Sequence, residues 1–156
     1  MSLTPAITWL KQYRSTNKQE PFKTIFAPDV PVAIISNNEI GILAAHLLAL
    51  DNITPHDHAK YTISGPEDFT GAQIVELVER EIGGKIEDVR FENLDFFEYL
   101  RGLGFAEIRI VGMKHALGAL WDGGLSVANM RTSEEVLELA RPKIAPGEAF
   151  AAMLRD

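Results

Sequence analysis

The sequence predicts an α/β fold class: an α+β-like accessory lobe, with a small, mostly parallel sheet of about four short strands and about six helices. Short apolar, β-branched runs alternate with longer segments whose apolar residues recur at helical spacing, which is typical of α/β and α+β proteins. Each strand candidate is short, so the sheet is expected to be small. A length of 156 residues favours a single domain over residues 1–156.

Capping signals mark the expected beginnings of the helices. Ser36 to Glu39 matches a capping box, in which the serine hydroxyl accepts from the Glu39 amide and the carboxylate returns to Ser36. The helix behind it, Ile40–Leu50, is apolar on nearly every side, so we expect it to lie between other elements. Thr70 and Gln73 form a second capping box. The other helices are expected from Thr4 to Asn17, from Thr70 to Gly83, from Asp95 to Gly102 or Gly104, from Glu107 to Trp121, from Thr132 to just before Pro142, and from Pro146 onward.

Four runs are expected to be strands because they are β-branched, apolar or alternating. They are Phe22–Phe26, Val30–Ile35, Tyr61–Ile63 and Ile86–Asn93.

Composition limits the classes of partner. The formal net charge is −7, which opposes binding to a phosphate backbone, and the sequence has no basic run, so we expect no direct nucleic-acid partner. The longest apolar stretch, Ile40–Leu50, is too short to span a bilayer, and the first residues lack the pattern of a signal peptide. The absence of cysteine fits a reducing compartment.

The order of several motifs resembles a known family. Three groups of residues carry the resemblance: Val32-Ala-Ile-Ile35 with Asn38-Glu39-Ile40-Gly41, then Tyr61-Thr-Ile-Ser-Gly-Pro-Glu67 with Thr70 and Gln73-Ile74, and finally Trp121-Asp-Gly-Gly-Leu-Ser126 with Thr132-Ser-Glu-Glu-Val136. They are similar to the C-terminal, substrate- or ligand-binding lobe of NmrA-like proteins, which are atypical short-chain dehydrogenases/reductases. Glu39 stands where that family usually has aspartate.

The resemblance implies a full-length protein that binds NAD(P)(H) and acts as a redox-sensing regulator or as a small-molecule reductase. It implies a small-molecule ligand, a transcription-factor partner of the GATA type, and a cytoplasmic or nuclear location. The family's G-x-x-G-x-x-G loop and Tyr-x-x-x-Lys pair are absent from this sequence. We therefore expect no Rossmann domain, no cofactor and no catalytic residue within the chain, and no dinucleotide binding by the chain alone.

Two alternatives to this regulatory or ligand-binding lobe remain open. One is the substrate lobe of an active NAD(P)H-dependent oxidoreductase. The other is a stand-alone protein-interaction module.

Two groups of residues are candidate ligand contacts. Asn37 and Asn38 follow a strand, at the edge where α/β proteins gather ligands, although helix capping and turn formation are favoured over ligand binding for them. The second group lies on the helix that, by resemblance, borders the substrate cleft: Met113, Lys114, His115 and Trp121. The alternative for Lys114 and His115 is the solvated side of an amphipathic helix.

The other histidines favour structural roles. His46 lies in the apolar Ile40–Leu50 helix, where a hydrogen-bonded core histidine is favoured over a catalytic one. His56-Asp57-His58 could offer ligands to a metal, but a solvated loop is favoured because no third, distant ligand is evident. We expect no metal site there.

We also expect a homodimer. A lobe that lacks its neighbouring domain should expose an apolar surface, which a closed two-fold dimer would bury. The expected contributors are Ile7, Trp9 and Leu10 with the strands Phe22–Phe26 and Val30–Ile35.

Overall fold

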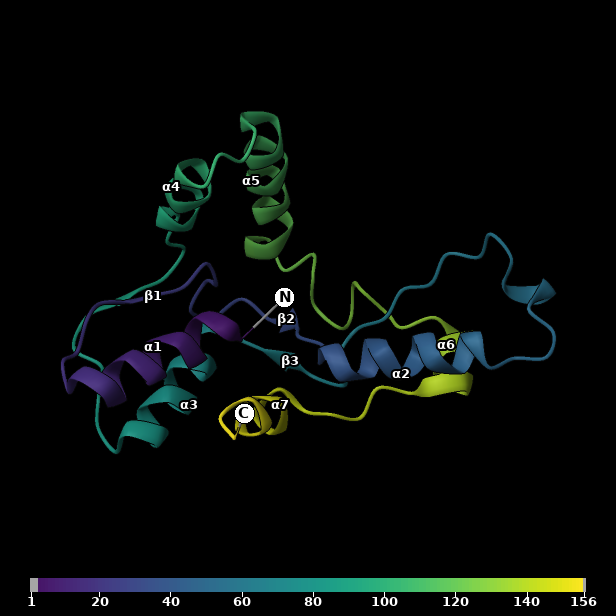
Figure 1. Ribbon diagram of the computed structural model, residues 1–156, viewed down its shortest axis with the longest axis horizontal. Coiled ribbons are helices and arrows are strands. Elements are labelled where there is room, and N and C mark those ends of the chain that lie inside the picture. Colours follow the sequence, from purple (N-terminus) through teal and green to yellow (C-terminus); the bar gives the residue numbers. More distant parts are fainter. Residues whose placement is uncertain (1–2, 156) are drawn as a thin grey trace. The chain divides into compact units, whose positions relative to one another are not determined.

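A computed structural model describes residues 3–155 and shows a mixed α/β chain that is dominated by helices (Figure 1). Helices, with one short 3-10 turn, account for 51% of the described residues and strands for 5%, so the α/β class holds only in this coarser form. The helices are α1 (Thr4–Thr16), α2 (Asn37–Leu48), α3 (Gly71–Ile82), α4 (Asp95–Gly102), α5 (Glu107–Trp121), α6 (Glu134–Ala140) and α7 (Pro146–Met153), with a short 3-10 turn, η1 (Thr54–His56). The strands are β1 (Phe22–Lys23), β2 (Val32–Ala33), β3 (Asp68–Phe69) and β4 (Val89–Arg90).

The strands form two separate pairs within the described residues, so the expected four-stranded sheet is wrong. β1 pairs in parallel with β4, with Phe22 opposite Val89, and β2 pairs with β3. The expected strand Tyr61–Ile63 is absent. Its backbone bonds instead to a loop, because the Thr62 N–H donates to the Ser133 hydroxyl at 3.0 Å and the Ser133 N–H donates to the Thr62 carbonyl at 3.0 Å.

The chain divides into two compact units, each assembled from segments far apart in sequence. We name the first, residues 33–69 and 126–155, the α2 unit; it contains α2, β3, α6 and α7. We name the second, residues 3–32 and 70–125, the α5 unit; it contains α1, α3, α4, α5, β1 and β4.

The apolar residues of α1 and the early strands, which were expected to be exposed, lie instead in the interior. α1 packs against α3, and Leu10 and Val78 are both fully buried. The Trp9 indole packs edge-on against Phe22 and donates a 2.8 Å hydrogen bond to the Glu20 carbonyl. The expectation that α1 and the early strands supply the dimer contact is therefore wrong: Ile7, Trp9, Leu10, Phe22, Phe26, Val32 and Ile34 are all buried.

The start of α3 confirms the second capping box. The Thr70 N–H donates to Gln73 Oε1 at 2.8 Å, and the Gln73 N–H donates to the Thr70 hydroxyl at 3.2 Å. Residue 71, directly after Thr70, must be glycine, since a Cβ on Gly71 would lie 2.4 Å from the Ala27 carbonyl oxygen. The cap and this close approach together fix where α3 begins.

Arg101 joins α4 to α5 electrostatically. Its guanidinium donates to both carboxylate oxygens of Glu107 at 2.9 Å and also to Glu98. These hydrogen bonds lower the pKa of both glutamates below their ordinary value of 4.5. The stabilisation is present above that value and is lost as pH falls through the lowered pKa values.

Replacing Arg101 with methionine should therefore flatten the acid limb of the stability profile. We expect the urea midpoint of R101M to fall less than that of the wild type between pH 5 and about pH 3, because its glutamates titrate near their ordinary pKa in both states. Arg109→Met is the control, because Arg109 is exposed and makes no ion pair among the contacts of residues 3–155. Parallel profiles for the wild type and R101M would contradict the effect of Arg101 on the two glutamates.

Across residues 3–155, no helix is both long enough and apolar enough to cross a membrane.

Candidate functional site

The beginning of α2 differs from the expected capping box. Ser36 is the N-cap, as expected, but its hydroxyl accepts from the Asn38 N–H at 3.3 Å. The Glu39 carboxylate does not return to Ser36. It turns instead toward the segment that follows α6, which frees the helix N-terminus from a reciprocal cap.

Glu39 is buried and only half satisfied. Glu39 is only 5% exposed. Its Oε1 accepts hydrogen bonds from the backbone N–H groups of Lys143 and Ile144, the latter at 2.8 Å. Oε2 is also buried and has no hydrogen-bond partner among the described residues. An unsatisfied buried polar atom costs about 1–3 kcal/mol, and more when it carries charge, so this oxygen needs an explanation.

The half-satisfied carboxylate lies in a groove of the α2 unit. The groove encloses about 580 Å³ between α2 and the chain from the end of α6 onward. Its lining residues are Glu39, Ile42, His46, Leu137, Glu138, Leu139, Ala140, Arg141, Lys143 and Ile144. We name it the Glu39 groove.

The end of α6 adds to the negative character of the Glu39 groove. The residues of its last turn, Leu137 to Ala140, all line the groove. The last four carbonyls of a helix have no partner within the helix and form the negative end of its dipole. Arg141 and Lys143 add positive charge, but both are exposed, so their fields are screened by salt more strongly than that of the buried Glu39.

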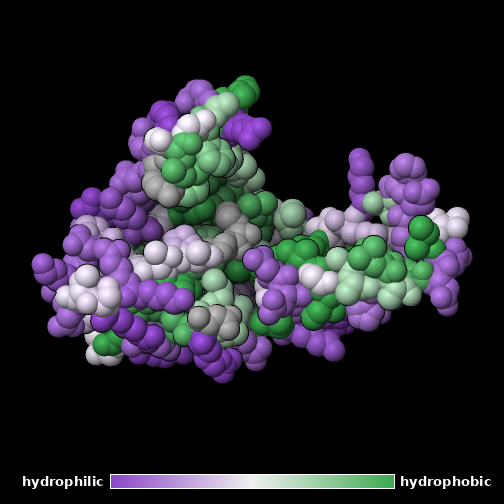
Figure 2. Space-filling view, viewed as in Figure 1, coloured by the Kyte–Doolittle hydropathy of each residue, from purple (hydrophilic) through white to green (hydrophobic). Residues whose placement is uncertain are grey.

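The outer side of α2 is an exposed apolar surface. Only Glu39 and Leu43 of this helix are buried. Ile40, Ile42 and Leu48 are 43%, 49% and 87% exposed. Gly41, Ala44, Ala45 and Ala49 are exposed with them. We name these seven residues the α2 face; Figure 2 shows hydrophobic residues gathered along α2.

The expectation that this helix lies between other elements is therefore wrong. Within its unit, α2 packs against α6, which lies along one side of it and is only about half as long (Figure 1). Apolar residues on every side of a helix predict burial, but they do not say that the covering surface is part of the same chain.

His46 lies at the boundary between the Glu39 groove and the α2 face. It is exposed, so the expected hydrogen-bonded core position is wrong. It lines the Glu39 groove and also a smaller hollow of about 270 Å³ with Ile42, Ala45 and Ala49. The sequence could not separate the two positions, because every neighbour of His46 in the helix is apolar.

The candidate ligand residues fall into different units. Asn37 and Asn38 occupy the exposed first turn of α2 in the α2 unit. Neither lines the Glu39 groove. Met113, Lys114, His115 and Trp121 belong to the α5 unit.

The four α5 residues have different surroundings. The Lys114 ammonium lies 5.5 Å from the centre of the Phe97 ring, and the Trp121 indole donates a 2.8 Å hydrogen bond to the Ile25 carbonyl. Both contacts account for their residues structurally. His115 is exposed, and its Nδ1 lies 2.9 Å from the Val111 carbonyl oxygen of the same helix. Met113 is half-buried. The expected solvated position therefore describes His115, whereas Lys114 is half-buried against Phe97.

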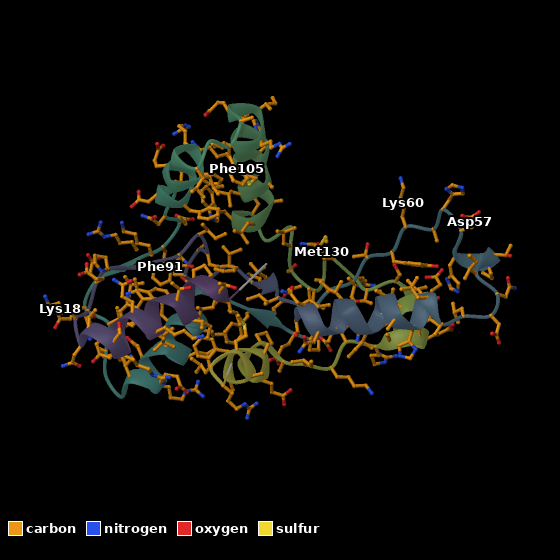
Figure 3. The ribbon with its side chains drawn as sticks, in the orientation of Figure 1. Lys18, Asp57, Lys60, Phe91, Phe105 and Met130 are labelled. Atoms are coloured by element: carbon orange, nitrogen blue, oxygen red, sulfur yellow. The ribbon has the colours of Figure 1, made fainter. Side chains whose placement is uncertain are left out.

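The loop with three candidate metal ligands is open (Figure 3, around Asp57). His56 Nδ1 lies 2.6 Å from the Tyr61 hydroxyl. The side chains of Asp57 and His58 are 70% and 95% exposed. Among residues 3–155 no three such side chains come together in a group that could hold a metal ion.

Comparisons with family models, with curated proteins and with solved structures found no match to this chain.

Proposed function

We propose that the chain is a partner-binding lobe and that its partner is a second copy of itself, held through the α2 face. One observation carries the proposal: the seven apolar residues of the α2 face stay exposed, because α6 covers only part of α2. Monomeric proteins rarely expose a contiguous apolar patch larger than a few hundred Å². The two hydrophobic side chains that project furthest, Ile42 and Leu48, are 49% and 87% exposed.

The composition of the α2 face suits a contact between identical helices. Gly41, Ala45 and Ala49 recur every four residues, so they lie along one line of the helix surface. Nothing lies within 4 Å of the place where a Cβ of Gly41 would be, so another backbone can approach closely there. A two-fold contact must be complementary to itself, and an uncharged surface of small and branched residues meets that condition.

Charge also favours a second copy over a polar partner. The chain carries a net charge of −7, which opposes self-association over long distances. The α2 face contains no ionisable residue, and His46 lies only at its boundary, so a contact made there brings no carboxylates together. Repulsion between the remaining surfaces is screened beyond about 8 Å at physiological salt.

The resemblance to NmrA-like proteins is compatible with this proposal but offers another occupant. If the chain belongs to a longer NAD(P)-linked regulator or reductase, the α2 face could contact a further domain or a transcription-factor partner. Those roles, and the cofactor that the resemblance implies, stay predictions. We place self-association first because only that occupant follows from the surface itself.

A charge on the α2 face should break the dimer. We expect Leu48→Glu to shift the chain from twice the mass of 17.3 kDa to a single copy in light scattering after size exclusion, at about 50 µM. In a two-fold contact the new carboxylates enter as a pair and are desolvated, so association should weaken at least ~100-fold.

Ile108→Glu is the matched control. Ile108 is 78% exposed, close to the 87% of Leu48, and lies on a helix of the α5 unit. We expect I108E to remain dimeric. A wild-type chain that is monomeric, or equal dissociation of both variants, would contradict the assignment of the interface to α2.

A further inference from the structure

Glu39 has an acceptor that the fold does not use. Its Oε1 is fully occupied by two backbone N–H groups, while Oε2 is buried and has no partner among residues 3–155. Lys143 supplies only its backbone N–H to this carboxylate; no ion pair between its ammonium and Glu39 is formed among the described contacts. A buried carboxylate oxygen in this state attracts a hydrogen-bond donor, most strongly a charged one.

The charges and the size of the Glu39 groove favour a donor that is positively charged and compact. The carboxylate and the free carbonyls at the end of α6 favour positive charge. Oε2 is shielded from solvent, so a small donor group reaches it more easily than a wide one. An ammonium group is compact and carries three donors, whereas a guanidinium is a wide, planar fork.

The remaining lining accommodates an apolar stem. Ile42, Leu137 and Ile144 line the same groove, whose volume of about 580 Å³ is ample for a short alkyl chain. Glu138 is a second acid in the lining, which also includes the exposed Arg141 and Lys143. A cation on an apolar stem matches this combination better than an anion or a neutral sugar-like ligand.

We propose that the Glu39 groove binds a primary alkylammonium group. Its N–H donors bond to Oε2 of Glu39 and to carbonyls at the end of α6, and its alkyl stem lies along the apolar lining. Every residue of the groove belongs to one α2 unit, and Ile42 is the one residue that the groove shares with the α2 face.

Hexylammonium is a suitable probe. It is titrated into the full chain while nitrogen–proton correlation NMR records the backbone amide signals. The amide signals of Lys143 and Ile144 report directly on Glu39, because those N–H groups bond to its other oxygen. We expect saturable shifts centred on these two amides with a Kd of about 1 mM or tighter, a modest affinity for a ligand of this size. Tetramethylammonium, which has the same charge but no N–H donor, should produce none.

Glu39→Gln tests the role of the carboxylate. It retains an oxygen for the two backbone N–H groups but removes the charge, and we expect hexylammonium affinity to fall at least tenfold. If E39Q fails to fold, the wild-type titration still decides. No saturable shift at Lys143 and Ile144, equal shifts with tetramethylammonium, or shifts spread over the acidic surface would each overturn the proposal.

Discussion

Gly65→Ala should destabilise the α2 unit more than alanine at any other glycine of that unit. A Cβ at this position would lie 1.9 Å from the Ile34 carbonyl oxygen and 2.8 Å from the Ile34 carbonyl carbon. Both atoms belong to the backbone, so no side-chain rotation can relieve the overlap. The chain must move apart at Ile34, and we expect a loss of about 3 kcal/mol in the free energy of unfolding, the upper end of the usual cost of overpacking.

Urea denaturation followed by circular dichroism measures this loss, and Gly147→Ala is its control. Gly147 lies in α7 of the same unit, and nothing lies within 4 Å of the place where its Cβ would be. We expect G147A to match the wild type or to gain up to about 1 kcal/mol, since alanine favours helices. Similar midpoints for G65A and the wild type would show that the segments at Ile34 and Gly65 are not in close contact.

Truncation of Leu10 provides the second large effect, in the α5 unit. Its side chain is 0% exposed where α1 packs against α3. Leu10→Ala removes apolar contacts and leaves a cavity, which costs about 2–5 kcal/mol. The urea midpoint should fall accordingly, without a change in the slope that reports the surface exposed on unfolding.

Leu103→Ala is the matched control, because it makes the same chemical change at a position that is 59% exposed in the same unit. Its free energy of unfolding should change by less than about 1 kcal/mol. Equal losses for Leu10→Ala and Leu103→Ala would contradict the packing of α1 on α3.

The sequence predicted the helices better than it predicted the sheet. Local signals were sufficient for helices: Thr70 and Gln73 cap α3, and Gly83 adopts the left-handed conformation that ends it. Strands depend on partners that the local sequence does not specify. The run Tyr61–Ile63 has strand-like residues, but hydroxyl groups from Thr132 and Ser133 satisfy its neighbouring backbone N–H groups instead.

The candidate site was harder to predict, for a related reason. The sequence around Glu39 is that of a helix cap. Its actual hydrogen-bond partner Lys143 is distant along the chain, so no local pattern could predict it. Burial of an apolar helix was also a reasonable expectation for α2. An apolar sequence predicts that a helix is covered, but not whether the covering surface belongs to the same chain.

A cross-link at the centre of the α2 face tests self-association most directly. The chain has no cysteine, so Ala45→Cys introduces a single thiol, and a disulfide requires two Cα atoms within about 7 Å. Ala116→Cys places an equally unique thiol on an exposed position of α5. Under mild oxidation at about 10 µM, we predict rapid formation of a disulfide-linked dimer from A45C and slow, collision-limited formation from A116C. Equal rates for the two variants, or a faster rate for A116C, would contradict self-association through α2.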